Sequence, residues 1–195
     1  MLEPNIREQI IELIHRQVVP AVGCTEPMAV ALCAARATEL LGEKPEKVSV
    51  LLSANILKNA MGVGIPGTGM IGLPIAIALG VLIGKSDYRL EVIKDLTPES
   101  LEAGKRFIGE DRIDIKLKEG ITEKLYIEVC CETAGHRATA VISGSHTNIV
   151  FEETDGKVLL DRLKPSAAAA DTAQLCLDLR TVWEFATTTP VEEID

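Results

Sequence analysis

The stretch KLYIEVCCETAGHRATAVISG, residues 124–144, decides the fold class. Two β-rich runs, KLYIEVCCET and RATAVISG, flank a short turn that contains glycine, which is the pattern of an antiparallel pair of strands. Similar runs lie on either side: RIDIKLKEG begins at residue 112, NIVFEET begins at residue 148, and KVLLDRL adds one more short strand. We therefore expect a mainly antiparallel sheet.

The first half of the chain has mainly helical periodicity, because its apolar residues recur at intervals of three and four. The expected elements outside the strand region are a helix over 5–18 that Pro20 ends, a helix from an N-cap at Thr25 to Gly42, a strand over 48–54, a glycine-rich connection over 56–69, a buried helix over 70–83, a short helix capped by Thr97 and a last helix over 167–187. This pattern predicts an α+β fold, with helices packed on the sheet, in a single domain over residues 1–195.

The composition narrows the class of function. Hydrophobic residues make up 47% of the chain and aromatic residues 3%, so the core must be aliphatic. A net charge of -9 without any Lys/Arg cluster argues against nucleic-acid binding. The dense apolar run at 70–83 is too short for a membrane span. The odd number of five cysteines, without a CxxC pair, argues against a disulfide framework. The N-terminus is amphipathic and does not have the pattern of a signal peptide, so we expect a cytoplasmic protein.

The segment AVGCTEP, residues 21–27, holds the first candidate for chemistry. Cys24 lies at a helix start, where the positive end of the helix dipole stabilises a thiolate and free N–H groups bind a carboxylate. Such a thiolate is a nucleophile, a base or a metal ligand. Thr25 and Glu26 follow it in the first turn. The alternative, a buried cysteine that only shapes a tight turn, stays open.

The glycine-rich segment LKNAMGVGIPGTGMIGLP, residues 57–74, is the second candidate. It imitates a dinucleotide fingerprint, but the preceding strand ends too early and a proline interrupts the loop, so nucleotide binding is not expected. We expect a tight loop whose amides face a small anionic ligand, although a purely structural turn explains the spacing equally well. The substrate-binding candidates here are Lys58, Asn59, Gly67, Thr68 and Gly69.

The segment SGSHTNIV, residues 143–150, is the third candidate. Its residues His146, Thr147 and Asn148 form a polar cluster that suits a carboxylate or an amine, although a histidine in such a turn is also common as a solvated loop residue. The other histidines, His15 and His136, have no obvious partner.

The remaining four cysteines are expected to be structural. Cys33 and Cys176 lie on apolar helix faces. Cys130 and Cys131 are adjacent on a strand, so they point to opposite faces of the sheet and do not make a metal pair. We expect no metal ligands in this chain.

Taken together, GCTEP, NAMGVGIPGTGMIGLPIA and GSHTNIV resemble the N-terminal half of the L-cysteine desulfidase family, which is related to the iron–sulfur L-serine dehydratases. The resemblance runs along essentially the whole chain, with the motifs in the family's order. Ser145 departs from the family pattern, which has a second glycine before HTN. The resemblance implies that L-cysteine and water give pyruvate, ammonia and sulfide, with Cys24 as the proton acceptor.

The resemblance also implies a [4Fe-4S] cluster that acts as a Lewis acid on the leaving group, without pyridoxal phosphate. In the family, three cysteines of a following segment hold this cluster, and the present chain stops at VEEID. We therefore expect no cofactor and no activity in this chain alone. The expected partners are a small amino-acid substrate, a C-terminal cluster-binding domain or subunit, and a further copy of the chain, because a cut domain boundary exposes apolar surface.

Other interpretations remain open. The chain is equally suited to be half of an L-serine dehydratase-like deaminase, because serine and cysteine present the same carboxylate and amine. Interpretations without chemistry are a module that binds a small amino acid and a purely structural remnant.

Overall fold

The computed structural model describes residues 2–163 and 177–194. The chain divides into two compact units, residues 21–164 and residues 1–20 with 165–195. The larger unit carries the sheet, and the smaller unit contains helices from both ends of the chain.

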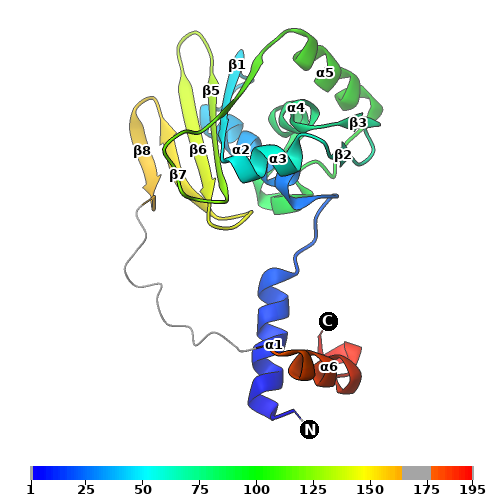
Figure 1. Ribbon diagram of the computed structural model, residues 1–195. Coiled ribbons are helices and arrows are strands. Elements are labelled where there is room, and N and C mark those ends of the chain that lie inside the picture. Colours follow the sequence, from blue (N-terminus) through cyan, green and yellow to red (C-terminus); the bar gives the residue numbers. More distant parts are fainter. Residues whose placement is uncertain (1, 164–176, 195) are drawn as a thin grey trace. The chain divides into compact units, whose positions relative to one another are not determined.

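A six-stranded sheet with the order β4-β1-β5-β6-β7-β8 forms the larger unit (Figure 1). Its strands are β1 (Lys47–Leu52), β4 (Ile113–Leu117), β5 (Tyr126–Glu132), β6 (Arg137–Ser143), β7 (Ile149–Thr154) and β8 (Lys157–Asp161). Neighbouring strands are antiparallel except for β1 and β4, which are parallel. Each strand predicted between residues 112 and 163 is present, and the α+β class is confirmed.

Helix α2 (Thr25–Leu41) covers one face of this sheet, and 11 of its 17 residues are buried. The facing strand β6 presents small side chains, Ala138 and Ala140, which are almost completely buried. Small residues on both surfaces allow the helix to pack closely on the strands. The thiol of Cys33 donates a hydrogen bond to the Ala140 carbonyl at 3.3 Å, so the prediction that Cys33 is a core residue is confirmed.

The adjacent cysteines of β5 lie on opposite faces of the sheet, as predicted. Cys131 faces α2, where its sulfur lies 3.6 Å from the Thr38 hydroxyl. Cys130 lies on the other face, and Arg137 Nε donates to its sulfur at 3.0 Å. Cys176 lies outside the described residues.

Helix α4 (Leu73–Ile83) packs against α2 on the side away from the sheet (Figure 1). A side chain at Gly80 would collide with the backbone of Ala31, and one at Gly84 would collide with Ala35. These contacts advance together along both helices, which shows that the helices are parallel. Eight of the 11 residues of α4 are buried. In the described part of the chain, no helix is long and apolar enough to cross a membrane.

The expected connection over residues 56–69 is wrong in its first part, because a short helix, α3 (Ala54–Ala60), follows β1. Ser53 caps this helix by accepting a hydrogen bond from the Ile56 N–H. Ile56 and Ala60 turn towards the core, and this burial stabilises a helix too short to show a pattern in the sequence. A small hairpin of β2 (Gly64–Ile65) and β3 (Met70–Ile71) follows.

Two further helix boundaries were predicted from capping residues. Thr97 caps α5 (Pro98–Gly109) in a capping box with Ser100, as expected. The prediction that Thr25 caps α2 is wrong by one residue, since Cys24 is the N-cap and Thr25 is already helical. The Thr25 hydroxyl donates instead to Glu26 Oε2 at 3.2 Å.

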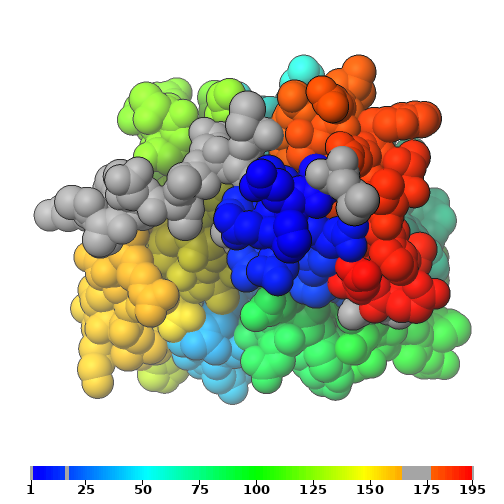
Figure 2. Space-filling view, turned by 90° about the horizontal axis from the view of Figure 1, so that it is seen from below, coloured from blue at the N-terminus to red at the C-terminus, as the bar shows by residue number. Residues whose placement is uncertain are grey.

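The smaller unit contains α1 (Pro4–Gln17), α6 (Leu179–Thr188) and a short 3-10 helix, Val191–Glu193. Figure 2 shows α1 in blue beside the red C-terminal residues. His15 Nε2 lies 2.7 Å from the Ile194 carbonyl, so the prediction that His15 lacks a partner is wrong. The predicted helix over 5–18 is confirmed within one residue. The first ten residues of the helix predicted over 167–187 lie outside the described residues.

We predict that Gly80→Ala destabilises the fold, because the added methyl group meets the Ala31 backbone between two buried helices. The expected loss in the free energy of unfolding is about 1–3 kcal/mol, typical of overpacking, measured by urea denaturation. Gly109→Ala is the matched control, since that exposed helical position has no atom near the added methyl group. Equal stability of the two variants would contradict close packing of α2 on α4.

Candidate functional site

The three sequence motifs lie at one end of the sheet. At this end β1 finishes, β5 begins and β6 turns into β7, and the Ser53 N–H donates to the Tyr126 carbonyl at 3.0 Å. Helix α2 also begins here, because it ends at Gly42, near the opposite end where β1 starts. The end of the sheet that holds the His146–Asn148 turn is therefore the end that holds Cys24.

Cys24 is exposed at the start of the buried helix α2. Its side chain makes no capping hydrogen bond, so the thiol remains available. The residue before it, Gly23, has a φ of 84°, and a Cβ there would lie 2.8 Å from the Pro66 side chain. Only glycine fits this contact. The contact holds the Cys24 turn directly against the loop that contains Gly67.

The loop between β2 and β3 is closed by its own threonine. The hydroxyl of Thr68 donates to the Ile65 carbonyl at 2.7 Å and accepts from the Met70 N–H at 3.0 Å. Gly67 and Gly69 both have positive φ values, 77° and 65°, which let the loop turn. The hydroxyl of Thr68 therefore shapes the loop, and the exposed glycine backbones at Gly67 and Gly69 are the parts that face outwards.

The turn between β6 and β7 is held together in the same way. Asn148 Nδ2 donates to the Ser143 carbonyl at 2.9 Å, and the Ser143 N–H donates to the Asn148 carbonyl at 3.1 Å. His146 and Thr147 are half-buried, and within the described residues their side chains make no hydrogen bond. The amide of Asn148 thus fixes the turn, while His146 and Thr147 keep free polar groups.

The beginnings of α2 and α4 lie at the same level. Gly80 packs on Ala31 in the parallel pair of helices, and continuing this register backwards brings Cys24 level with Leu73. Two positive helix ends therefore point to the same end of the unit, where they favour an anion. Lys58 and Asn59 of α3 are exposed near this end and make no hydrogen bond to any described residue.

A cavity of about 560 Å³ opens between the β6–β7 turn and α2. Thr147 is the one sequence-predicted site residue in its lining. Asp87 and Arg89 also line it, from the short 3-10 helix η1 (Ser86–Glu91). Neither residue was predicted to belong to a site, because η1 has no clear period and the dinucleotide fingerprint that would use Asp87 was not expected.

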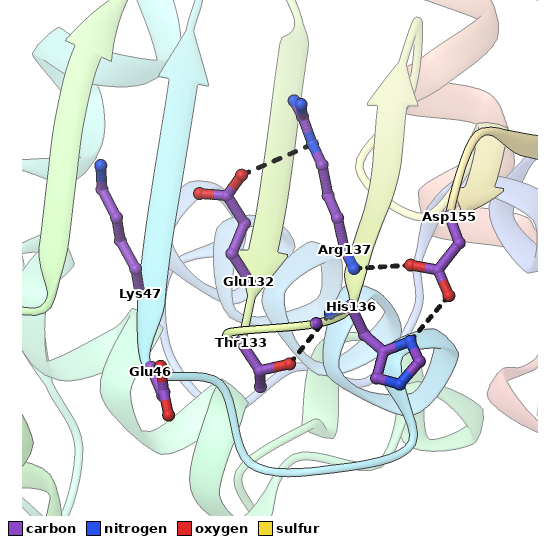
Figure 3. A pocket seen from close by; sticks show the side chains of 8 residues that line it. Glu46, Lys47, Glu132, Thr133, His136, Arg137 and Asp155 are labelled. Carbon is purple, nitrogen blue, oxygen red and sulfur yellow. Dashed lines mark hydrogen bonds and ion pairs between the residues drawn. The ribbon is translucent and has the colours of Figure 1, made fainter.

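A second cavity, of about 380 Å³, lies at the opposite end of the sheet (Figure 3). Figure 3 shows His136 and Asp155 pointing towards each other there, with His136 Nδ1 2.8 Å from Asp155 Oδ2. The prediction that His136 has no partner is therefore wrong. The partner comes from the turn between β7 and β8, which only the strand pairing brings near.

The described cysteines do not fit an iron–sulfur cluster. Burial raises the pKa of Cys33, and burial raises the pKa of Cys131 to about 12, so both are held as neutral thiols. Cys130 faces the other side of the sheet, and Cys24 lies at its end. Among residues 2–163 and 177–194, no group of three or more His, Cys, Asp or Glu side chains is placed to hold a metal ion.

We predict that Cys24 is alkylated faster by iodoacetamide than Cys33, Cys130 or Cys131 in the folded chain. Cys24 is exposed, whereas the other three are buried. Site-resolved mass spectrometry measures each rate, and unfolding in urea supplies the control in which burial no longer separates the four thiols. A Cys24 rate as slow as that of Cys33 in the folded chain would show that its thiol is not accessible.

We also predict that His136 titrates above its ordinary value. The hydrogen bond with Asp155, and then its charge, raise the pKa of His136 above 6.5. Because the folded pKa of His136 is raised, its protonated form stabilises the fold fully below about pH 6.5 while Asp155 is ionised, and this contribution is lost as the pH rises through the raised pKa. Asp155→Asn should return the His136 pKa towards 6.5 in an NMR titration.

Asn tolerates the left-handed backbone of residue 155, whose φ is 50°, so this variant keeps the turn. Asp161→Asn removes a carboxylate from the far end of β8, the strand that follows this turn, and serves as the matched control. The assignment fails if Asp155→Asn leaves the His136 titration as it is in the control.

The known proteins that this chain resembles are longer than the chain itself. No family model matches the chain, and no solved structure matches it. The chain is 65% identical over 188 residues to a UPF0597 protein of Bacteroides fragilis, an alignment that covers 96% of this chain and 44% of that protein. It is 63% identical to a UPF0597 protein of Bacteroides thetaiotaomicron with the same coverage, and 46% identical to one of Aeromonas hydrophila, covering 42% of it. The chain thus resembles UPF0597 proteins and spans less than half the length of these curated relatives.

Proposed function

We propose that this chain is the substrate-binding, proton-accepting half of an L-cysteine desulfidase-like lyase. The observation that supports this best is the exposed, uncapped thiol of Cys24 at the start of α2. The contact between Gly23 and Pro66 holds that thiol beside the Gly67–Gly69 loop. Two of the three motifs that carry the family resemblance are therefore in contact, and the third lies at the same end of the sheet.

In the proposed reaction, the thiolate of Cys24 accepts the α-proton of L-cysteine. The electron pair left behind forms the Cα–Cβ double bond, and the β-sulfur leaves as sulfide. Loss of the amino group as ammonia, with addition of water, then gives pyruvate. The positive end of α2 favours the negative charge of the substrate carboxylate beside Cys24.

The other residues at this end would position the substrate. His146 and Thr147 carry free polar groups, and the backbones of Gly67 and Gly69 are exposed. Because the described cysteines do not fit an iron–sulfur cluster, the proposed reaction gives them no role as cluster ligands. A cluster of the kind that the resemblance implies belongs to a separate, cluster-binding domain or subunit in this proposal.

The location and partners of the protein follow from the same proposal. A lyase that acts on free amino acids and depends on reduced thiols suits the cytoplasm. The relatives are more than twice as long as their match to this chain, which supports a partner segment that completes the active site. A half of an L-serine dehydratase-like enzyme would use the same residues, with hydroxide in place of sulfide as the leaving group.

The test is to express the chain together with the part of the Bacteroides fragilis relative that it does not match, and to reconstitute the mixture anaerobically with iron and sulfide. Pyruvate should form from L-cysteine in the mixture and not with the 195-residue chain alone. Cys24→Ser should lower the rate by about 10²–10⁴-fold, the usual contribution of a general base. L-serine, run in parallel, tells the two leaving groups apart.

Cys130→Ser is the matched control, because it makes the same substitution on the sheet face away from α2. Cys130→Ser should change the rate by less than about threefold, a much smaller effect than the loss of a general base. Two results would reject the proposal: steady pyruvate formation by the chain alone, or an unchanged rate for Cys24→Ser in the mixture.

A further inference from the structure

The cavity beside η1 contains charged groups that nothing in the described structure neutralises. Its volume, about 560 Å³, lies in the range of small-molecule sites. Arg89 and Asp87 both line it and are exposed, and within the described residues neither side chain makes a hydrogen bond or an ion pair. Among the described residues, one unpaired cation and one unpaired anion therefore border the same cavity.

The other charged groups of the cavity are already paired. Arg36 donates to both carboxylate oxygens of Glu152, at 2.7 and 3.1 Å, and to Glu39 at 3.3 Å. The hydrogen bond from Arg36 to Glu152 is also the first cause that raises the pKa of Arg36. Glu39 in turn accepts from the Ser86 N–H at 2.7 Å. These contacts fix the wall of the cavity and leave ligand recognition to Asp87, Arg89 and Thr147.

The backbone at Arg89 is strained, with φ 51° and ψ -123°. Such a conformation favours glycine, so an arginine here is held against its own preference, as is frequent at binding sites. The next residue, Leu90, accepts a hydrogen bond from the Val22 N–H at 3.0 Å. Arg89 is thus adjacent to the segment that leads into Cys24.

We propose that this cavity binds a small free α-amino acid as its zwitterion, with Arg89 holding the carboxylate and Asp87 the ammonium group. A guanidinium matches a carboxylate with two parallel hydrogen bonds. The Thr147 hydroxyl adds a third polar contact, and Leu32 and Ile149 offer an apolar wall for the β-carbon. The choice of a small amino acid rests on the proposed function.

The test is calorimetric titration of the 195-residue chain with L-serine, ethanolamine and glycerate. Ethanolamine lacks the carboxylate, and glycerate lacks the ammonium group. The unmodified chain should bind L-serine about tenfold more tightly than either analogue, the size of one charged hydrogen bond. Arg89→Gln should abolish the preference over ethanolamine, and Asp87→Asn should abolish the preference over glycerate.

Arg106→Gln is the matched control, because it removes an exposed cation from α5 outside the cavity. Arg89→Gly checks the fold: glycine relieves the strained backbone, so this variant should melt no lower than the unmodified chain while losing the same preference as Arg89→Gln. Equal binding of L-serine by Arg89→Gln and Arg106→Gln would overturn the assignment of Arg89. Absence of L-serine binding by the unmodified chain would overturn the cavity as an amino-acid site.

The number of L-serine molecules bound per chain distinguishes a single amino-acid site from two. One L-serine per chain, lost in Arg89→Gln, identifies the cavity as the single amino-acid site of this chain. Two per chain, one of which survives in Arg89→Gln, identifies an effector site beside it. Either result supports the zwitterion site. The pyruvate assay with Cys24→Ser is independent of this titration, so failure here leaves the proposed lyase function to be judged by that assay.

Discussion

The close contact between α2 and α4 is the constraint on which the rest of the structure depends. Gly80 and Gly84 allow the α4 backbone to reach Ala31 and Ala35, and small residues of β6 allow the other side of α2 to approach the sheet. A helix enclosed on both sides has little room for polar groups on those two sides. Its free N–H groups lie at its start, and the parallel packing places the starts of both helices at one end.

The environment, rather than the residue type, separates the cysteines of α2. Cys33 lies between the helix and the sheet, where burial raises the pKa of its thiol and keeps it neutral. Cys24, two and a half turns earlier, is exposed where the helix N–H groups are free. Because the turn before Cys24 contacts Pro66 through Gly23 and Leu90 through Val22, two segments distant in the sequence set the position of the thiol.

The motif residues divide into those that shape loops and those that are free to bind. The side chains of Thr68 and Asn148 form hydrogen bonds within their own turns, so their role in a binding site would be to fix the backbone around them. His146, Thr147 and the exposed glycines keep free groups. Asp87 and Arg89, which have no partner among the described residues, come from η1, a segment that carries no recognisable motif.

The sequence alone determined the strands of the six-stranded sheet (but not the β2–β3 hairpin), the α+β class, most helix boundaries and the structural character of Cys33, Cys130 and Cys131. Local patterns suffice for these features, since alternation and helical periodicity reflect which face is buried. The sequence could not determine the cap at Cys24, the helix α3, or the partners of His15 and His136, because each depends on contacts between distant segments. The cavity at Arg89 was decided by the tertiary structure alone: its lining comes from α2, η1 and the β6–β7 region, which meet only when α2 is packed on the sheet.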